Sequence, residues 1–407
     1  MVLEMRKMKD SGIEWIGEIP EGWEVVPVKR LCTMQAGKNL TSEQIAPEGT
    51  YPVYGGNGIR GFFSDYNCDG QFLTVGRQGA LCGNVHKING KVWATEHAVI
   101  TTPSSYTILD FLYFLLIGMD LNQYVSSTAA QPGLAVGTLL NLKTCYPCST
   151  LEQTQISNYL NAKCSEIDVM LSKTRSSIEE YKKLKQAVIT QAVTKGVRGE
   201  REMKDSGVEW IGTYPRNWKI IKIKWLLHER KNRSVTGLEE PLSMSQKKGL
   251  IPTKDMDSIP NMASSFIGAK LVYKGDLVFN KLKAHLGVFS VSKYNGLVSP
   301  DYAVYYSTGL ANLNFLELLF KTPRYISEFK KKSSGVGAGL TRLYTGDLYS
   351  IYCALPPLVE QKEIADYLDA KCTEIDGLIA KKEQLVKELE SYKKSLIYEV
   401  VTGKREV

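Results

Sequence analysis

A segment near the start of the chain recurs almost unchanged in its middle. Residues 8–31 read MKDSGIEWIGEIPEGWEVVPVKRL, and residues 203–226 read MKDSGVEWIGTYPRNWKIIKIKWL. Thirteen positions are identical, without a gap, at a spacing of 195 residues. Internal repeats of this length are considered before any local motif, because they divide a chain into copies of one structural block.

A second repeat follows in the same order. Residues 151–171 read LEQTQISNYLNAKCSEIDVML, and residues 359–379 read VEQKEIADYLDAKCTEIDGLI, at a spacing of 208. We therefore predict two tandem blocks, each with an opening repeat, a variable segment and a closing helix. The predicted boundaries are a first domain at 1–148, a first long helix at 149–198, a second domain at 199–356 and a second long helix at 357–407.

The closing segments show the heptad pattern of a coiled coil. With Leu160 at position a, apolar residues recur at a and d over four to five heptads. Lysine occupies the same d position in both copies, at Lys185 and Lys393, and a polar residue there can fix helix register. The first closing segment contains no Gly or Pro before Gly196. The second contains one glycine, Gly377, within the heptad pattern. The alternative is an amphipathic helix lying on a globular core.

The variable segments differ from each other and favour strands. Residues 32–148 and 227–356 contain short β-branched and aromatic runs between Gly, Asn and Pro. One helix is predicted in each, around 109–119 and 312–332. The run HAVI after Gly90 matches DYAVY after Gly296, so we expect one shared α/β fold. The predicted class is α+β: two mixed α/β domains, a pair of long antiparallel helices, and a pseudo-two-fold internal repeat.

Helices of this length suggest a spacer. About 45 residues at ~1.5 Å per residue span roughly 65 Å. Half-sites read from one face of B-DNA lie one helical turn of ~34 Å, or a multiple of it, apart. Two similar domains on such a spacer therefore suggest a bipartite DNA target, although a protein scaffold could use the same geometry.

Charge separates the two domains. The chain carries a net charge of +8, which by itself favours an anionic partner only weakly. Residues 31–148 hold six Lys and Arg against seven Asp and Glu, whereas residues 226–356 hold seventeen against ten. We expect the second domain to supply most of the salt-dependent phosphate affinity, and the first to rely on polar and shape contacts.

The start of the chain has no secretory signal, and no apolar run reaches the ~20 residues of a membrane span. The eight cysteines do not form a disulfide framework and suit a reducing cytoplasm. We therefore expect a cytoplasmic prokaryotic protein without a membrane partner.

No motif predicts an active site or a metal site. GGNGIRG (55–61) matches a phosphate-binding glycine pattern but continues into FFSDY rather than a helix, so a turn-rich loop is expected. Asp301 with Glu328 and Lys330 imitates a nuclease pattern, yet the latter two lie in a predicted helix. Cys145 and Cys148 lack a second pair at zinc spacing. These absences favour a non-catalytic binding subunit.

The whole pattern resembles the DNA specificity subunits of Type I restriction–modification systems. The resemblance rests on the two repeats, on GDLVFNKLKAHLG (275–287) and NGLVSPDYAVY (295–305), and on VGRQGALCGNV (75–85) and QPGL (131–134). It covers essentially the whole chain. One departure is CYPCSTLEQ at the start of the first long helix, where the family usually has Leu-Pro-Pro-Leu, as residues 355–358 do.

The resemblance implies roles for the parts. The variable segments would be target recognition domains, and the helices would set their spacing and dock two methyltransferase subunits. Restriction translocase–nuclease subunits would join that core. The chain itself would be non-catalytic, without a cofactor or metal, because S-adenosylmethionine, ATP and Mg belong to the partner subunits. An internally duplicated nuclease and a coiled-coil scaffold remain the alternatives.

Candidate contacts to double-stranded DNA are Arg and Lys, which can read guanine, and Asn and Gln, which can read adenine. In the first domain they are Asn57, Arg60, Arg77, Gln78, Lys87 and Gln131. In the second domain they are Gln246, Lys247, Lys248, Asn280, Lys281, Lys283, His285 and Arg342.

Overall fold

The computed structural model describes residues 6–78, 82–125, 133–245, 248–258, 265–335 and 341–407. The chain forms two compact units, the first from residues 1–176 and 383–407 and the second from residues 177–382. Each unit holds one variable segment together with a stretch of each long helix.

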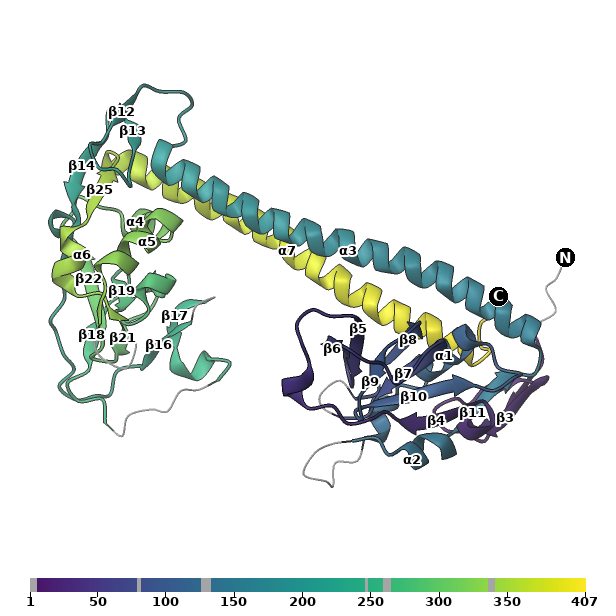
Figure 1. The fold of residues 1–407 in the computed structure, drawn as a ribbon. Coiled ribbons are helices and arrows are strands. Elements are labelled where there is room, and N and C mark those ends of the chain that lie inside the picture. The colour runs from purple at the N-terminus through teal and green to yellow at the C-terminus, as the bar shows by residue number, and fades with distance from the viewer. Residues whose placement is uncertain (1–5, 79–81, 126–132, 246–247, 259–264, 336–340) are drawn as a thin grey trace. The chain divides into compact units, whose positions relative to one another are not determined.

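The first unit is built on a four-stranded antiparallel sheet. Its strand order is β4-β10-β7-β8, from β4 (Cys32–Ala36), β10 (Ala98–Pro103), β7 (Gln71–Gly76) and β8 (Val85–Asn89). The helix α1 (Leu109–Gly118) packs on this sheet through a fully buried apolar core (Figure 1). A second sheet of order β6-β5-β9 contains β5 (Tyr51–Gly55), β6 (Gly58–Phe63) and β9 (Trp93–Ala94).

The second unit repeats this sheet. Its order is β15-β22-β19-β20, from β15 (Leu227–Glu229), β22 (Tyr302–Ser307), β19 (Leu277–Asn280) and β20 (Phe289–Val291). Two antiparallel two-stranded sheets are added: β16 (Leu242–Ser245) with β17 (Gly249–Pro252), and β18 (Lys270–Val272) with β21 (Gly296–Val298). The common strand order confirms the shared fold expected from HAVI and DYAVY.

Two predictions about helices were incomplete. The single helix expected over 312–332 is two helices, α4 (Leu313–Phe320) and α5 (Pro323–Lys332). The break falls at Pro323, which lacks an N–H donor and is favoured in the first turn of a new helix. The helices α2 (Val136–Asn141) and α6 (Thr345–Ser350) were not predicted, because six residues are too few to show a helical period.

The opening repeats fold in the same way in both units. β1 (Met8–Asp10) pairs with β2 (Glu18–Pro20), and β12 (Met203–Asp205) pairs with β13 (Thr213–Pro215) in the same register. Further pairs join β3 (Trp23–Pro27) to β11 (Lys143–Pro147) and β14 (Lys219–Lys222) to β25 (Tyr352–Leu355). The remaining short elements are η1 (Val28–Arg30), η2 (Ser42–Gln44), η3 (Leu121–Tyr124), η4 (Ile223–Trp225), η5 (Thr253–Asp255), η6 (Ala284–Leu286), β23 (Ser334–Gly335) and β24 (Thr341–Arg342).

The closing repeats form the long helices α3 (Thr150–Lys195) and α7 (Leu358–Val401). All the predicted a and d positions are buried or half-buried, so the heptad interpretation is confirmed. The helices run antiparallel within each unit. In the first, Asp168 pairs with Lys393 at 2.7 Å, and in the second, Asp376 pairs with Lys185 at 2.6 Å.

These two ion pairs are copies of one another at the spacing of 208 residues. They explain the lysines at d positions, because each ammonium reaches a carboxylate on the other helix. The lysine side chains keep 27% and 29% of their exposure, so each pair adds less than about 1 kcal/mol to stability. Because each lysine has its carboxylate at one position of the other helix, we expect the pairs to favour this register.

Both long helices begin with the same buried glutamine. Gln153 accepts a hydrogen bond from the Ile108 backbone N–H and donates to the carbonyls of Tyr106 and Pro147. Gln361 is its copy in α7. It accepts from the Asn312 backbone N–H and donates to the carbonyls of Leu310 and Pro356. The departure CYPCSTLEQ therefore leaves the start of α3 equivalent to that of α7.

The first unit is completed by the end of the chain. Leu396, Ile397, Val400 and Val401 of α7 are buried in its core. Tyr398 donates a hydrogen bond to the carbonyl of Trp15 at 2.8 Å. Trp15 and Tyr398 are 383 positions apart, so the N-terminal unit depends on residues from the end of α7.

Candidate nucleic-acid interface

Candidate residues of the first unit meet at one end of its central sheet. The β5–β6 turn, which carries Gly56 and Asn57, packs against the end of β7. A Cβ built on Gly76 would lie 1.8 Å from the Gly56 carbonyl oxygen, so only glycine allows this approach. A Cβ on Gly56 would lie 3.1 Å from the carbonyl oxygen of Gln78. The glycines of GGNGIRG thus serve close backbone packing rather than phosphate binding.

We call the polar side chains around this turn the first polar edge. It consists of Asn57, Arg77, Gln78, Asn84, His86, Glu96 and His97. Asn84 donates to Asn57 at 2.8 Å, and Nε2 of His97 lies 3.1 Å from Oε1 of Glu96.

Four buried polar atoms of the first polar edge have no hydrogen-bond partner among the described residues. They are Nε of Arg77, Nε2 of His86, Nδ1 of His97 and Oε2 of Glu96. Leaving a buried polar atom unpaired costs about 1–3 kcal/mol. Burial also lowers the pKa of His86, which keeps its ring neutral near pH 7. Donors and acceptors left unpaired in one place are suited to a polar ligand such as a base edge.

The other first-domain candidates lie elsewhere. Arg60 is on strand β6, so its placement in a loop was wrong, because the turn is confined to two residues. Lys87 faces the helices, where its ammonium lies 2.8 Å from Asp110 and 4.5 Å from the centre of the Tyr113 ring. We therefore do not retain Lys87 as a DNA contact. Gln131 is outside the described residues.

The second unit has a corresponding second polar edge, made of Asn280, Lys281, Asp301, Tyr302 and Arg342. Asn280 pairs with Tyr302 at the end of β19. Nη2 of Arg342 donates to Oδ1 of Asp301 at 2.9 Å. Burial, and then the nearby charges of Lys270 and Arg342, lower the pKa of Lys281. Cations crowded in this way favour an acceptor-rich or anionic ligand.

The remaining second-domain candidates surround this edge less closely. Lys283 is exposed just before η6, and His285 is half-buried within it. Lys248 pairs with Asp257 at 2.7 Å. Gln246 and Lys247 fall on positions that the structure does not describe. For every candidate other than Lys87, contact with DNA stays a prediction.

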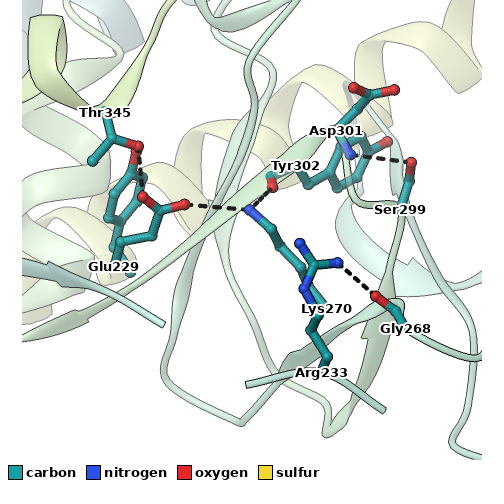
Figure 2. A network of polar contacts seen from close by, with 9 residues as sticks. Glu229, Arg233, Gly268, Lys270, Ser299, Asp301, Tyr302 and Thr345 are labelled. Atoms are coloured by element: carbon teal, nitrogen blue, oxygen red, sulfur yellow. Dashed lines mark hydrogen bonds and ion pairs between the residues drawn. The ribbon is translucent and has the colours of Figure 1, made fainter. Parts of the chain in front are cut away.

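A largely buried ion pair of Lys270 and Glu229 contacts the second polar edge at Tyr302 (Figure 2). The ammonium of Lys270 donates to Glu229 at 3.2 Å and to the Tyr302 carbonyl at 2.8 Å. Glu229 also accepts from the hydroxyl of Thr345 at 2.9 Å, and that hydroxyl lies 3.0 Å from Tyr305. One network therefore holds both the turn before β22 and the start of α6.

The strand registers align the two edges residue by residue. Ala98 pairs with Gly76 in the first unit, and Ala303 pairs with Phe279 in the second. Continuing each register matches Arg77 with Asn280 and Gln78 with Lys281, while HAVI and DYAVY match Glu96 with Asp301 and His97 with Tyr302. The same backbone frame therefore presents different side chains in the two units.

Sequence reasoning missed Glu96, His97, Lys270 and Glu229 as members of these sites. The first two directly precede a repeated strand, which was a usable signal. No pattern links Glu229 to Lys270, because 41 residues separate them.

The structure offers little for catalysis. Among the residues it describes, no group of three or more His, Cys, Asp or Glu side chains is arranged to hold a metal ion. Asp301 lies before β22, whereas Glu328 and Lys330 lie on α5, so they do not share adjacent strands. Cys145 is buried near Val401, and Cys148 is exposed. All eight cysteines are unpaired.

Comparison with known proteins assigns the class. The family model described as Type I restriction modification DNA specificity domain matches residues 20–180 and again 215–388. Two copies of this domain cover most of the sequence. The chain therefore belongs to the Type I restriction–modification DNA specificity family.

Individual relatives agree with this assignment. The chain is 44% identical over 121 residues to the EcoprrI specificity subunit of Escherichia coli, a match that spans 29% of this chain and 30% of that protein. It is 25% identical over 439 aligned positions to the putative MjaX specificity subunit of Methanocaldococcus jannaschii, which covers 99% of this chain and 98% of that protein.

Solved structures share the fold. A chain from a type I R-M system covers 95% of this chain and 99% of its own length, with a TM-score of 0.67 and 14% identity. The HsdS subunit of Thermoanaerobacter tengcongensis covers 95% and 98%, with a TM-score of 0.51 and 15% identity. In addition, none of the described helices combines the length and the apolar character needed to span a bilayer.

Proposed function

We propose that this chain is the sequence-reading subunit of a Type I restriction–modification complex. Each unit would read one half of a split DNA sequence with its polar edge. The main support for this proposal is that the two polar edges align residue by residue. The same strands in each unit carry different polar side chains at equivalent positions. Direct readout in the major groove needs such polar groups, held in fixed positions.

The two halves are proposed to differ in their use of phosphate contacts. The second variable segment carries a net charge of +7, against −1 for the first. Phosphate contacts release counterions, so binding through the second unit should weaken more steeply with salt. The first unit would depend more on its unpaired polar atoms.

The direct test uses the full-length chain with a library of random DNA duplexes. We expect enrichment of two short motifs separated by a fixed gap. Mapping methylated adenines in a host that carries the complete system should return the same split motif. Enrichment of one continuous motif, or of none, would contradict the proposal.

Arg77→Ala is expected to relax the motif read by the first unit. Arg77 ends a strand next to the Gly56–Asn57 turn, and its Nε has no described partner. Loss of a base contact costs on the order of tenfold in discrimination, so one position of the first motif should become degenerate. Arg30→Ala is the matched control, because Arg30 is exposed beyond the opposite end of β4. An unchanged motif in Arg77→Ala would remove Arg77 from the interface.

We propose that the long helices dock two methyltransferase subunits. Exposed apolar side chains recur on them at the repeat spacing of 208 residues. Leu151 matches Val359, with 69% and 68% exposure, and Leu184 matches Tyr392, with 48% and 49%. Apolar side chains that remain exposed at matched positions suggest two equivalent protein-binding surfaces.

Leu184→Asp is expected to weaken copurification with the methyltransferase partner by tenfold or more, because a charge would enter an apolar contact. Selection of DNA motifs by the chain alone should not change. Leu238→Asp is the control, since Leu238 is 87% exposed but lies outside the helices. Equal loss in both variants would argue against a specific docking surface.

Catalysis, S-adenosylmethionine, ATP and Mg are assigned by this proposal to partner subunits, including the restriction translocase–nuclease. The work of the chain would then take place in the prokaryotic cytoplasm, where the target DNA is. Metal-dependent cleavage of DNA by the purified chain would instead support the nuclease alternative. Absence of any DNA binding, with partner binding retained, would support the scaffold.

A further inference from the structure

Arg342 is held in one orientation but keeps free donors. It lies on β24, and its Nη2 donates to Asp301 at 2.9 Å. A guanidinium has five N–H donors, and Nε of Arg342 has no partner among the described residues. Asp301 keeps 58% of its side-chain exposure and Arg342 keeps 25%. The two side chains therefore hold each other by one hydrogen bond while both remain partly exposed.

The ion pair of Lys270 and Glu229 contacts residues that are near Asp301 and Arg342 in the sequence. Lys270, which is 8% exposed, donates to the carbonyl of Tyr302, the residue after Asp301. Its partner Glu229 accepts from Thr345, three residues after Arg342. The Asp301 backbone N–H also donates to the Ser299 hydroxyl at 3.4 Å (Figure 2). Such anchoring reduces the ordering cost of binding, because the reading groups are already in position.

The surroundings favour a ligand rich in acceptors. Burial, and then the charges of Lys270 and Arg342, lower the pKa of Lys281, so all three cations lie in one neighbourhood. Glu229 and Asp301 are the nearby carboxylates. Three cations against two anions leave an excess of donors at this point of the second polar edge.

From this arrangement we infer that Arg342 and Asp301 together read one G·C base pair in the half-site of the second unit. The inference rests on the proposed function. In the major groove guanine presents two acceptors, O6 and N7, and cytosine presents the N4 amino donor. Arg342 can only donate, and ionised Asp301 can only accept. An adenine would instead place its N6 amino donor against the donors of Arg342.

The test is selection from random duplexes by the full-length chain and its Arg342→Gln and Asp301→Asn variants. The wild-type chain should enrich a G·C pair in the second motif. Arg342→Gln should lose preference there by about tenfold and leave the first motif unchanged. Asp301→Asn should lose the preference for cytosine at the same pair. Replacing that guanine with 7-deazaguanine should weaken the wild-type chain, but not Arg342→Gln.

Two further variants exclude trivial explanations. Arg342→Lys keeps the charge but not the rigid two-pronged donor geometry, so it should weaken the preference for guanine more than it weakens binding overall. Arg216→Gln removes an exposed arginine of the same unit that pairs with Glu202, and it should leave both motifs intact. Retention of the first motif and an unchanged melting temperature show that Arg342→Gln is folded.

The outcomes distinguish failure of this inference from failure of the proposed function. If Arg342→Gln enriches the wild-type motif and only loses affinity uniformly, Arg342 contacts phosphate and the inference fails while the proposed function stands. If the wild-type chain enriches no motif, the proposed function fails and the inference fails with it.

Discussion

Val401→Asp is expected to unfold the first unit while the second unit stays folded. Val401 is fully buried in the core of the first unit. It packs so closely on α1 that a Cβ at Gly118 would lie 2.6 Å from one of its methyl carbons. A carboxylate in this apolar core would cost about 4 kcal/mol or more. Since a whole domain is stable by only about 5–15 kcal/mol, that cost removes a large part or all of the stability of the first unit.

Hydrogen exchange, read peptide by peptide, gives the measurement. Peptides from 6–125 should lose protection in Val401→Asp, and peptides from 203–335 should keep it. Val407→Asp serves as the control, because Val407 is six residues later and 41% exposed. Retained protection in the first unit of Val401→Asp would show that α7 is dispensable for it.

Gly76→Ala is expected to abolish selection of the first motif and to leave the second motif intact. The added methyl group would lie 1.8 Å from the Gly56 carbonyl oxygen, about half of an ordinary contact distance. The Gly56–Asn57 turn or the end of β7 must then move, and overpacking of this kind costs about 1–3 kcal/mol. The first polar edge is built from these two segments, so its side chains would no longer converge.

Selection from random duplexes, together with a melting curve, tests this expectation. Gly137→Ala is the matched change, because a Cβ at Gly137 meets nothing within 4 Å and the residue lies on α2. It should keep both motifs and gain up to about 1 kcal/mol through helix propensity. A Gly76→Ala chain that still selects the first motif would show that the turn does not position the interface.

Several features were accessible from the sequence because they are periodic or repeated. The repeats at spacings of 195 and 208 identified the two blocks, and the heptads located both long helices. The lysines at d positions, Lys185 and Lys393, predicted that polar contacts fix the helix register. The sequence did not identify their carboxylate partners. The Gly-flanked position of Arg77 located one side of the first polar edge.

Other features depend on contacts that no local pattern encodes. Lys87 was predicted to contact DNA because it is a cation on a predicted surface strand. Tertiary packing decides which face of β8 meets α1, and on that face Lys87 pairs with Asp110. Thr345 lies 116 residues from Glu229, so their network has no counterpart in local sequence. The break at Pro323 was readable in principle, yet the apolar period on both sides of it hid the interruption.

Completion of the first unit by α7 has a consequence for biosynthesis. A ribosome adds about 5–20 residues per second, so the N-terminal recognition segment has to wait for roughly 280 further residues before Leu396, Val400 and Val401 emerge. The main core of the second unit, by contrast, lies within residues 177–382. A chain that stopped before residue 396 would therefore lack part of the core of its first unit, and that unit would be open to proteases.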